Sequence, residues 1–143
     1  MAVNVGQKFY NLEELEDSET CTTEIFLNAD QTVDVGETDG PVFIKASGTW
    51  TQERSKGGDD PGSFQMTLLR TYEAGREASS PTDMGEFHFT VERTFTGIVT
   101  KVGSSVAVTG SMHHVDELSG GDQQVGYFNM IDTTKERLGE KDD

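Results

Sequence analysis

The chain has little of what stabilises secreted or membrane-spanning proteins: it carries one cysteine, Cys21, and no long apolar run in 143 residues. A single cysteine forms no intrachain disulfide, which excludes a disulfide-stapled secreted scaffold. A helix that crosses a bilayer needs roughly 20 consecutive apolar residues, so we expect no membrane insertion. We therefore expect a soluble protein of a reducing compartment, the cytosol or the interior of an organelle, and leave open a cleaved targeting segment.

Basic residues are also scarce, since 11 lysines and arginines face 26 aspartates and glutamates, for a net charge of −15. A protein of this charge repels the phosphate backbone of nucleic acids, so we expect no nucleic-acid partner. The same charge would attract and steer a basic protein surface.

The common catalytic motifs are absent. The chain has no Gly-x-Ser-x-Gly and no Gly-rich phosphate loop, and Cys21 has no histidine near it in the sequence. An isomerase or cyclase working in a barrel cavity would need His88 or Glu92 in the lumen, yet both alternate with the apolar face of their strand. The sequence favours a non-enzymatic role without a cofactor.

A metal site is considered around the two adjacent histidines, which are followed by three acidic residues. On a strand, adjacent side chains point to opposite faces, so the two histidines cannot share one metal without a local turn. A solvated acidic loop is the favoured interpretation of His113, His114, Asp116, Glu117 and Asp122.

The remaining pattern is that of short strands separated by turns. Runs rich in Val, Ile, Thr and Phe alternate with clusters of Gly, Asp, Asn and Pro, and no helix of ten or more residues separates them. This predicts an all-β fold, an up-and-down antiparallel barrel or flattened barrel of about eight strands, in one domain over residues 1–143. The predicted strands are 22–28, 31–36, 41–52, 63–73, 86–95, 97–102, 105–113 and 124–131.

The two ends of the chain have a different character. In the N-terminal segment, residues 1–20, apolar side chains three apart and early acidic residues predict a short helix over 11–17. Residues 132–143 form a charged C-terminal tail with a single apolar side chain.

Alternation along the strands predicts which side chains face the core. Residues 64–72 and 87–95 match each other at a constant spacing of 23, and each run places an arginine on its apolar face. The last predicted strand shows Val125, Tyr127 and Ile131 on one face, and Gly48 and Gly110 indicate bends within strands. The expected inward residues of the matching runs are Phe64, Met66, Leu68, Arg70 and Tyr72, and Phe87, Phe89, Val91, Arg93 and Phe95.

The triplet Gly48-Thr49-Trp50 resembles the Gly-x-Trp signature of lipocalins and related calycin barrels. The triplet lies on the third predicted strand, whereas the lipocalin signature lies on the first. The resemblance implies that Trp50 packs across a closed end of the barrel. It also implies a binder of fatty-acid type, in which an inward arginine holds a ligand carboxylate within an aromatic wall.

Arg70 and Arg93 are the central candidates, because an inward arginine must find a carboxylate, a carbonyl or a bound anion. One hypothesis is a non-enzymatic barrel that binds a small apolar or amphipathic carboxylate. The alternative interpretation pairs each arginine with one of the chain's own acids near a barrel end, in an accessory or assembly protein that docks on a larger complex through its acidic surface. The candidate ligand-binding residues are Arg70, Arg93, Tyr72, Phe64, Phe87, Phe89 and Trp50.

Overall fold

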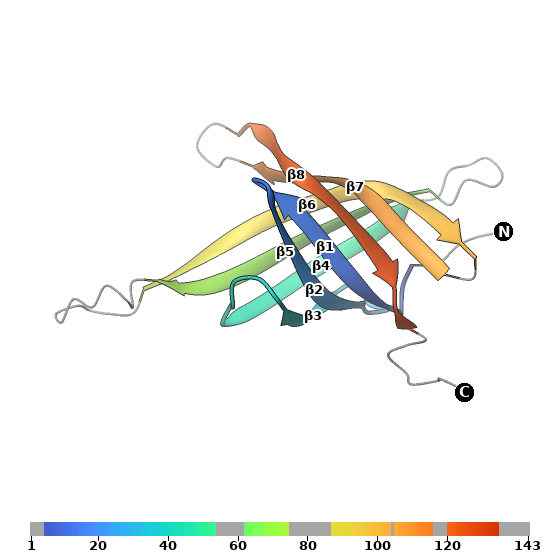
Figure 1. Cartoon of the computed structure of the whole chain (residues 1–143), viewed down its shortest axis with the longest axis horizontal. Coiled ribbons are helices and arrows are strands. Elements are labelled where there is room, and N and C mark those ends of the chain that lie inside the picture. The colour runs from blue at the N-terminus through green and yellow to red at the C-terminus, as the bar shows by residue number, and fades with distance from the viewer. Residues whose placement is uncertain (1–4, 54–61, 75–86, 104, 116–119, 135–143) are drawn as a thin grey trace.

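The computed structural model describes residues 5–53, 62–74, 87–103, 105–115 and 120–134, which form one eight-stranded sheet (Figure 1). Most of the two segments between the predicted strands 41–52, 63–73 and 86–95, and most of the C-terminal tail, lie outside the described residues. The strands are β1 (Phe9–Glu16), β2 (Glu19–Leu27), β3 (Val33–Thr38), β4 (Lys45–Glu53), β5 (Ser63–Ala74), β6 (Phe87–Val102), β7 (Ser105–Val115) and β8 (Asp122–Asp132).

The sheet closes almost completely on itself. Its order is β3-β2-β1-β8-β7-β6-β5-β4, and every neighbouring pair is antiparallel. Just before the edge strand β3, Thr32 forms an isolated bridge with Thr49 on the other edge strand, β4. Next to this bridge, the Trp50 amide donates to the Gln31 carbonyl at 3.0 Å. The predicted antiparallel up-and-down barrel of eight strands is confirmed, with one seam that is nearly closed.

The predicted N-terminal helix over residues 11–17 is wrong. These residues belong to β1 and to the two-residue turn that follows it, and the described part of the N-terminal segment holds no helix. Tyr10, Leu12 and Glu14 alternate inward along β1, which pairs with β2 on one side and β8 on the other. The ladder bonds of two neighbours and the burial of Leu12 outweigh a weak helical spacing.

The number of strands agrees with the prediction, but the bounds of the strands differ from it at a second place. Residues 86–95 and 97–102 were expected as two strands, but they form the single 16-residue strand β6, which continues through Gly97. Residues 28–31 form a turn between β2 and β3, in which Gln31 has a left-handed backbone with φ 74°. Among the described residues, no helix has the length and apolar character needed to cross a membrane.

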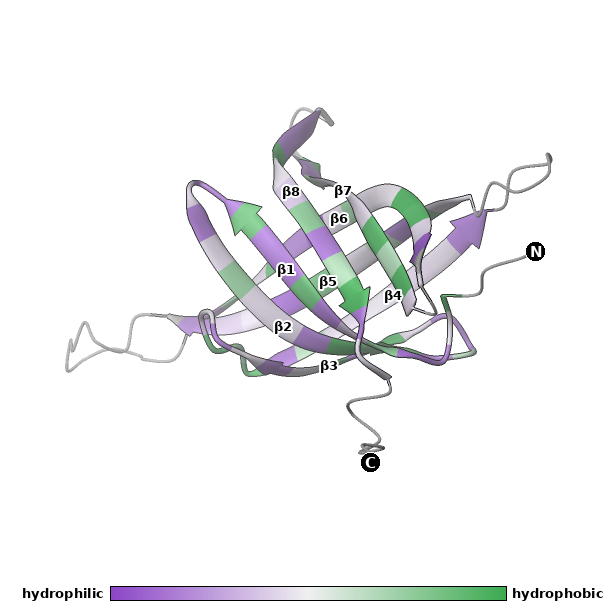
Figure 2. Cartoon of the chain, turned by 45° about the vertical axis from the view of Figure 1, so that its right-hand side comes forward, coloured by the Kyte–Doolittle hydropathy of each residue, from purple (hydrophilic) through white to green (hydrophobic). Residues whose placement is uncertain are grey.

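The barrel interior is a packed apolar core over most of its length. Alternation placed the inner face of β5 correctly, because Phe64, Met66 and Leu68 are all buried. The hydropathy colouring of Figure 2 shows alternating apolar and polar residues along the strands. The buried apolar residues are Val5, Tyr10, Leu12, Ile25, Leu27, Val33, Trp50, Phe64, Met66, Leu68, Phe95, Val99, Val106, Val108, Met112, Phe128 and Met130.

The expected inner face of the last strand is wrong. Val125 packs against the core, but Tyr127 and Ile131 are exposed, and the buried residues of β8 are Phe128 and Met130.

A β-bulge explains this shift. In the β7–β8 ladder Met112 pairs with Gly126 and His113 pairs with Gln124, which leaves Val125 as an extra residue. One extra residue reverses the alternation of the strand beyond it, so a uniform period of two fails there.

Gly48 and Gly110 lie where neighbouring strands approach closely. A Cβ atom at Gly110 would collide with the Thr96 carbonyl oxygen on β6. One at Gly48 would lie 2.6 Å from Leu68 Cδ2 and 2.7 Å from the Thr67 carbonyl oxygen. These glycines allow the tight coiling that a small barrel requires.

We expect Gly110→Ala to lower the free energy of unfolding by about 1–3 kcal/mol, because the new methyl group forces backbone apart. Gly36→Ala is the matched control, since a Cβ there meets its nearest atom, the Glu24 carbonyl oxygen, at 3.4 Å. The control should change stability by less than about 0.5 kcal/mol. Urea unfolding of both variants measures the difference, and equal losses would contradict the packing argument.

Candidate binding pocket at one barrel end

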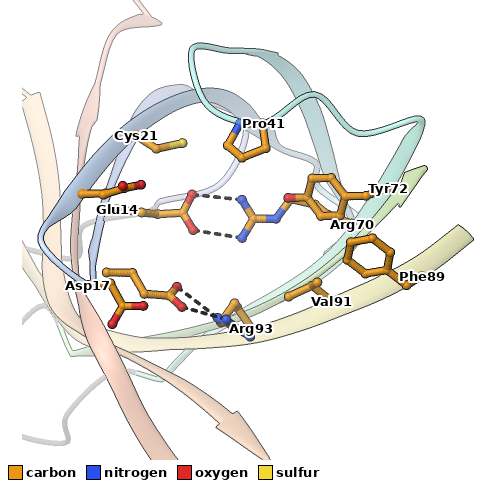
Figure 3. Close-up of a pocket in the computed structure, with 11 residues that line it drawn as sticks. Glu14, Asp17, Cys21, Pro41, Arg70, Tyr72, Phe89, Val91 and Arg93 are labelled. Atoms are coloured by element: carbon orange, nitrogen blue, oxygen red, sulfur yellow. Dashed lines mark hydrogen bonds and ion pairs between the residues drawn. The ribbon is translucent and has the colours of Figure 1, made fainter. Parts of the chain in front are cut away.

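A pocket of about 480 Å³ opens at the barrel end where the β1–β2 turn lies (Figure 3). Inward side chains of β1, β2, β5 and β6 line it together with the connection between β3 and β4. The lining residues are Glu14, Glu16, Asp17, Glu19, Cys21, Pro41, Arg70, Tyr72, Phe89, Val91 and Arg93.

Arg70 and Glu14 form a double hydrogen bond across the barrel. The two terminal nitrogens of Arg70 on β5 donate to the two carboxylate oxygens of Glu14 on β1, both at 2.9 Å (Figure 3). In the sheet order, β1 and β5 are separated by three strands, so the pair connects opposite walls. One inward position below it, Leu12 and Leu68 are fully buried, and the pair therefore separates the apolar core from the pocket.

This ion pair is deeply buried, with Glu14 6% and Arg70 7% exposed. Burial alone would lower the pKa of the Arg70 guanidinium, but the bonds and charge of Glu14 outweigh it and raise that pKa. Arg70 therefore stays charged at neutral pH. Its Nε is buried and finds no hydrogen-bond partner among the described residues.

A second pair lies nearer the opening. Arg93 on β6 donates from Nε to one oxygen of Glu16 at 3.2 Å and from a terminal nitrogen to the other at 2.8 Å. Its other terminal nitrogen donates to the Glu92 carbonyl at 3.1 Å. The side chains of this pair are 18% and 30% exposed, so water screens it more than the pair below.

Aromatic side chains form one wall of the pocket. Tyr72 and Phe89 pair across β5 and β6, and their rings stack with centroids 5.5 Å apart at 26°. Phe43 packs edge-on against Tyr72. Burial is the main cause that raises the pKa of the Tyr72 phenol, so its hydroxyl stays protonated at neutral pH. Phe89 is 44% exposed and presents apolar surface to the pocket.

Four of the seven predicted ligand-binding residues meet in this pocket: Arg70, Arg93, Tyr72 and Phe89. Phe64 and Trp50 instead stack on each other in the core. Phe87 begins β6, but its side chain lies outside the described part of the chain.

The acidic half of the pocket was missed because residues 11–17 were interpreted as a helix. On a strand, Tyr10, Leu12, Glu14 and Glu16 share one face, and this alternation was readable in the sequence. An inward arginine needs an acceptor such as a carboxylate, so Arg70 and Arg93 also pointed to inward acidic residues.

The residues considered for catalysis and metal binding lie elsewhere. His88 and Glu92 are exposed and do not line the pocket. His113 contacts Asp122 at 3.2 Å, whereas His114 lies near the Glu92 carbonyl. Within the described ranges, no group of three or more histidine, cysteine or acidic residues is placed to hold a metal ion.

The fold and the site define an up-and-down, nearly closed barrel with a polar pocket at one end. Comparison with protein-family models, with curated protein sequences and with solved structures finds no match to this chain. The functional argument therefore rests on the geometry of the pocket.

We expect Glu14→Leu and Arg70→Met each to lower the free energy of unfolding by about 3–5 kcal/mol, because each leaves a buried charge unpaired. The double variant should lose clearly less than the sum, since it removes both charges. Breaking the partly exposed pair of Arg93 and Glu16 with Glu16→Leu should cost only about 1 kcal/mol. Urea unfolding of the wild type and the four variants tests this, and strictly additive losses would show that the pair is not coupled.

Proposed function

We propose that this protein is a non-enzymatic binding barrel that holds a small amphipathic molecule in the pocket at its end. The observation that carries the proposal is the pocket itself, about 480 Å³ in volume, with ion-paired side chains on one side and an aromatic wall on the other. Ligand sites of small molecules have this size and this mixture of apolar lining and few polar groups.

The packed core restricts where a ligand can lie. The interior on the far side of the Arg70–Glu14 pair is filled by the chain's own apolar residues, as is common in barrels of eight strands. A ligand would therefore occupy the end pocket and not the centre of the barrel.

The resemblance to lipocalins and calycin barrels supports this arrangement. Trp50 is buried, stacks on Phe64 and donates from its indole nitrogen to the Asn28 carbonyl at 3.0 Å. Asn28 follows the end of β2 that is remote from the pocket, since the pocket residues Glu19 and Cys21 lie at the other end of this strand. We infer a barrel of the calycin plan, closed around Trp50 and open at the pocket.

A neutral amphipathic dye such as Nile red tests the proposal. We expect saturable binding of one dye molecule per chain. Phe89→Ala should weaken it about tenfold, because removing a half-buried aromatic side chain costs a little over 1 kcal/mol of apolar contact. Tyr127→Ala, which removes an exposed ring outside the pocket, is the control and should bind as the wild type does. Absence of saturable binding would remove the proposal.

A second candidate is an accessory protein that docks on a basic partner. Leu15 on β1 and Tyr127 on β8 pair directly and point outward, 44% and 61% exposed. Ile131 is exposed further along β8. Outward apolar side chains on adjacent strands of a protein with net charge −15 would suit a partner with a basic rim around an apolar patch.

A pull-down with wild type and a Leu15→Ser/Tyr127→Ser variant tests this candidate. A basic protein retained by wild type at low salt, and lost both at high salt and with the variant, is the expected result. Recovery of free monomer alone under all conditions would count against docking.

A further inference from the structure

The charges around the pocket are unbalanced. Its described lining contains two guanidinium groups and four carboxylates, those of Arg70, Arg93, Glu14, Glu16, Asp17 and Glu19. Both guanidinium groups are taken by Glu14 and Glu16 through two hydrogen bonds each. Asp17 and Glu19 form no ion pair with any described residue. The pocket therefore has an excess of negative charge at its rim.

A ligand carboxylate would meet a high cost in this pocket. To bind Arg70 it would have to displace Glu14, which is 6% exposed and has no other basic partner among the described residues. A buried carboxylate without a partner is strongly unfavourable. A ligand cation incurs no such cost, because the carboxylates of the rim are accessible.

The acidic rim and the apolar wall face each other across the pocket. Figure 3 shows Glu14 and Asp17 on one side and Tyr72 and Phe89 on the other. Phe89 is half exposed, so its ring can contact the apolar body of a ligand, and aromatic faces also attract cations. This separation matches a molecule that has a charged end and an apolar end.

Arg70 supplies an observation that is independent of the acidic rim. It is more than nine-tenths buried at the pocket wall, and its Nε–H has no acceptor in the described structure. A buried donor without an acceptor is uncommon and costs free energy. Because protein atoms enclose this Nε, it gives a ligand anion no second way to reach Arg70 without displacing Glu14.

We propose that the pocket takes an organic ammonium compound, a protonated amine on a short apolar body, with the ammonium group at Asp17 and Glu19 and the body against Tyr72 and Phe89. This rests on the proposed binding function and specifies its ligand class. This ligand class differs from the carboxylate expected from the sequence, and the experiment below compares the two directly.

Three phenyl compounds of the same chain length compare an ammonium, a carboxylate and a neutral hydroxyl head group. They are 3-phenylpropylamine, 3-phenylpropanoate and 3-phenylpropanol. Displacement of Nile red at neutral pH and low salt measures their affinities. We expect the amine to bind about fivefold to tenfold tighter than the alcohol, and the carboxylate to bind more weakly than both. Added salt should reduce the advantage of the amine.

The variant Asp17→Asn/Glu19→Gln should abolish the advantage of the amine and leave the alcohol unchanged. Asp17 has a left-handed backbone with φ 55°, which asparagine adopts readily, so the turn is preserved. Asp34→Asn/Glu53→Gln is the matched control, because it removes the same charge from exposed positions toward the other barrel end. The control should keep the full preference.

The outcomes distinguish this inference from the function on which it rests. If Nile red does not bind saturably, the proposed function fails. If the dye binds but the carboxylate competes better than the amine, or the control loses the preference as fully as the rim variant does, the pocket is a binding site and the ammonium assignment is wrong.

Discussion

The ion pair between Glu14 and Arg70 joins two opposite walls of the barrel, and the division of the interior depends on it. Below the pair, apolar side chains from all around the barrel fill the lumen. Above it, charged and aromatic side chains surround an open pocket. Two charges taken from water need each other in good geometry, and the double hydrogen bond at 2.9 Å supplies it. The position of the pair along β1 and β5 thus sets the depth of the pocket.

The close approach of neighbouring strands at Gly48 and Gly110 contributes to the same division of the interior, because it keeps the barrel narrow. Both glycines lie on the inner face, where a side chain would collide with the neighbouring strand. Their lack of a side chain lets the sheet coil tightly enough for β1 to come within reach of β5 across the lumen. The cross-lumen ion pair and the inward glycines are therefore two requirements of one narrow barrel.

The alternation of apolar and polar residues made much of the barrel predictable. Where a prediction from this alternation failed, the structure gives a physical cause. The inward face of β5 followed from simple alternation, because its ladders with β4 and β6 have no register shift. Alternation failed on β8, where the bulge at Val125 shifts the phase. It was also overlooked on β1, since inward carboxylates at Glu14 and Glu16 do not look like a core pattern.

The basic and aromatic half of the pocket was predictable for a similar reason. Arg70, Arg93, Tyr72 and Phe89 continue apolar runs on their strands, so they stand out as inward residues. Phe64 and Trp50 share such faces but lie on the other side of the ion pair. Alternation shows which face a residue occupies and says nothing of its height along the barrel axis. That height became clear only with the register of the strands.

At the seam between β3 and β4, the described residues form one isolated bridge, between Thr32 just before β3 and Thr49 on β4. Strand edges at such a seam can recruit a strand from another molecule and begin aggregation. Here β3 is only six residues long and carries exposed Asp34 and Glu37. Short length and acidic side chains discourage a second chain from pairing with this edge, so the negative charge that shapes the pocket also disfavours edge-to-edge pairing at β3.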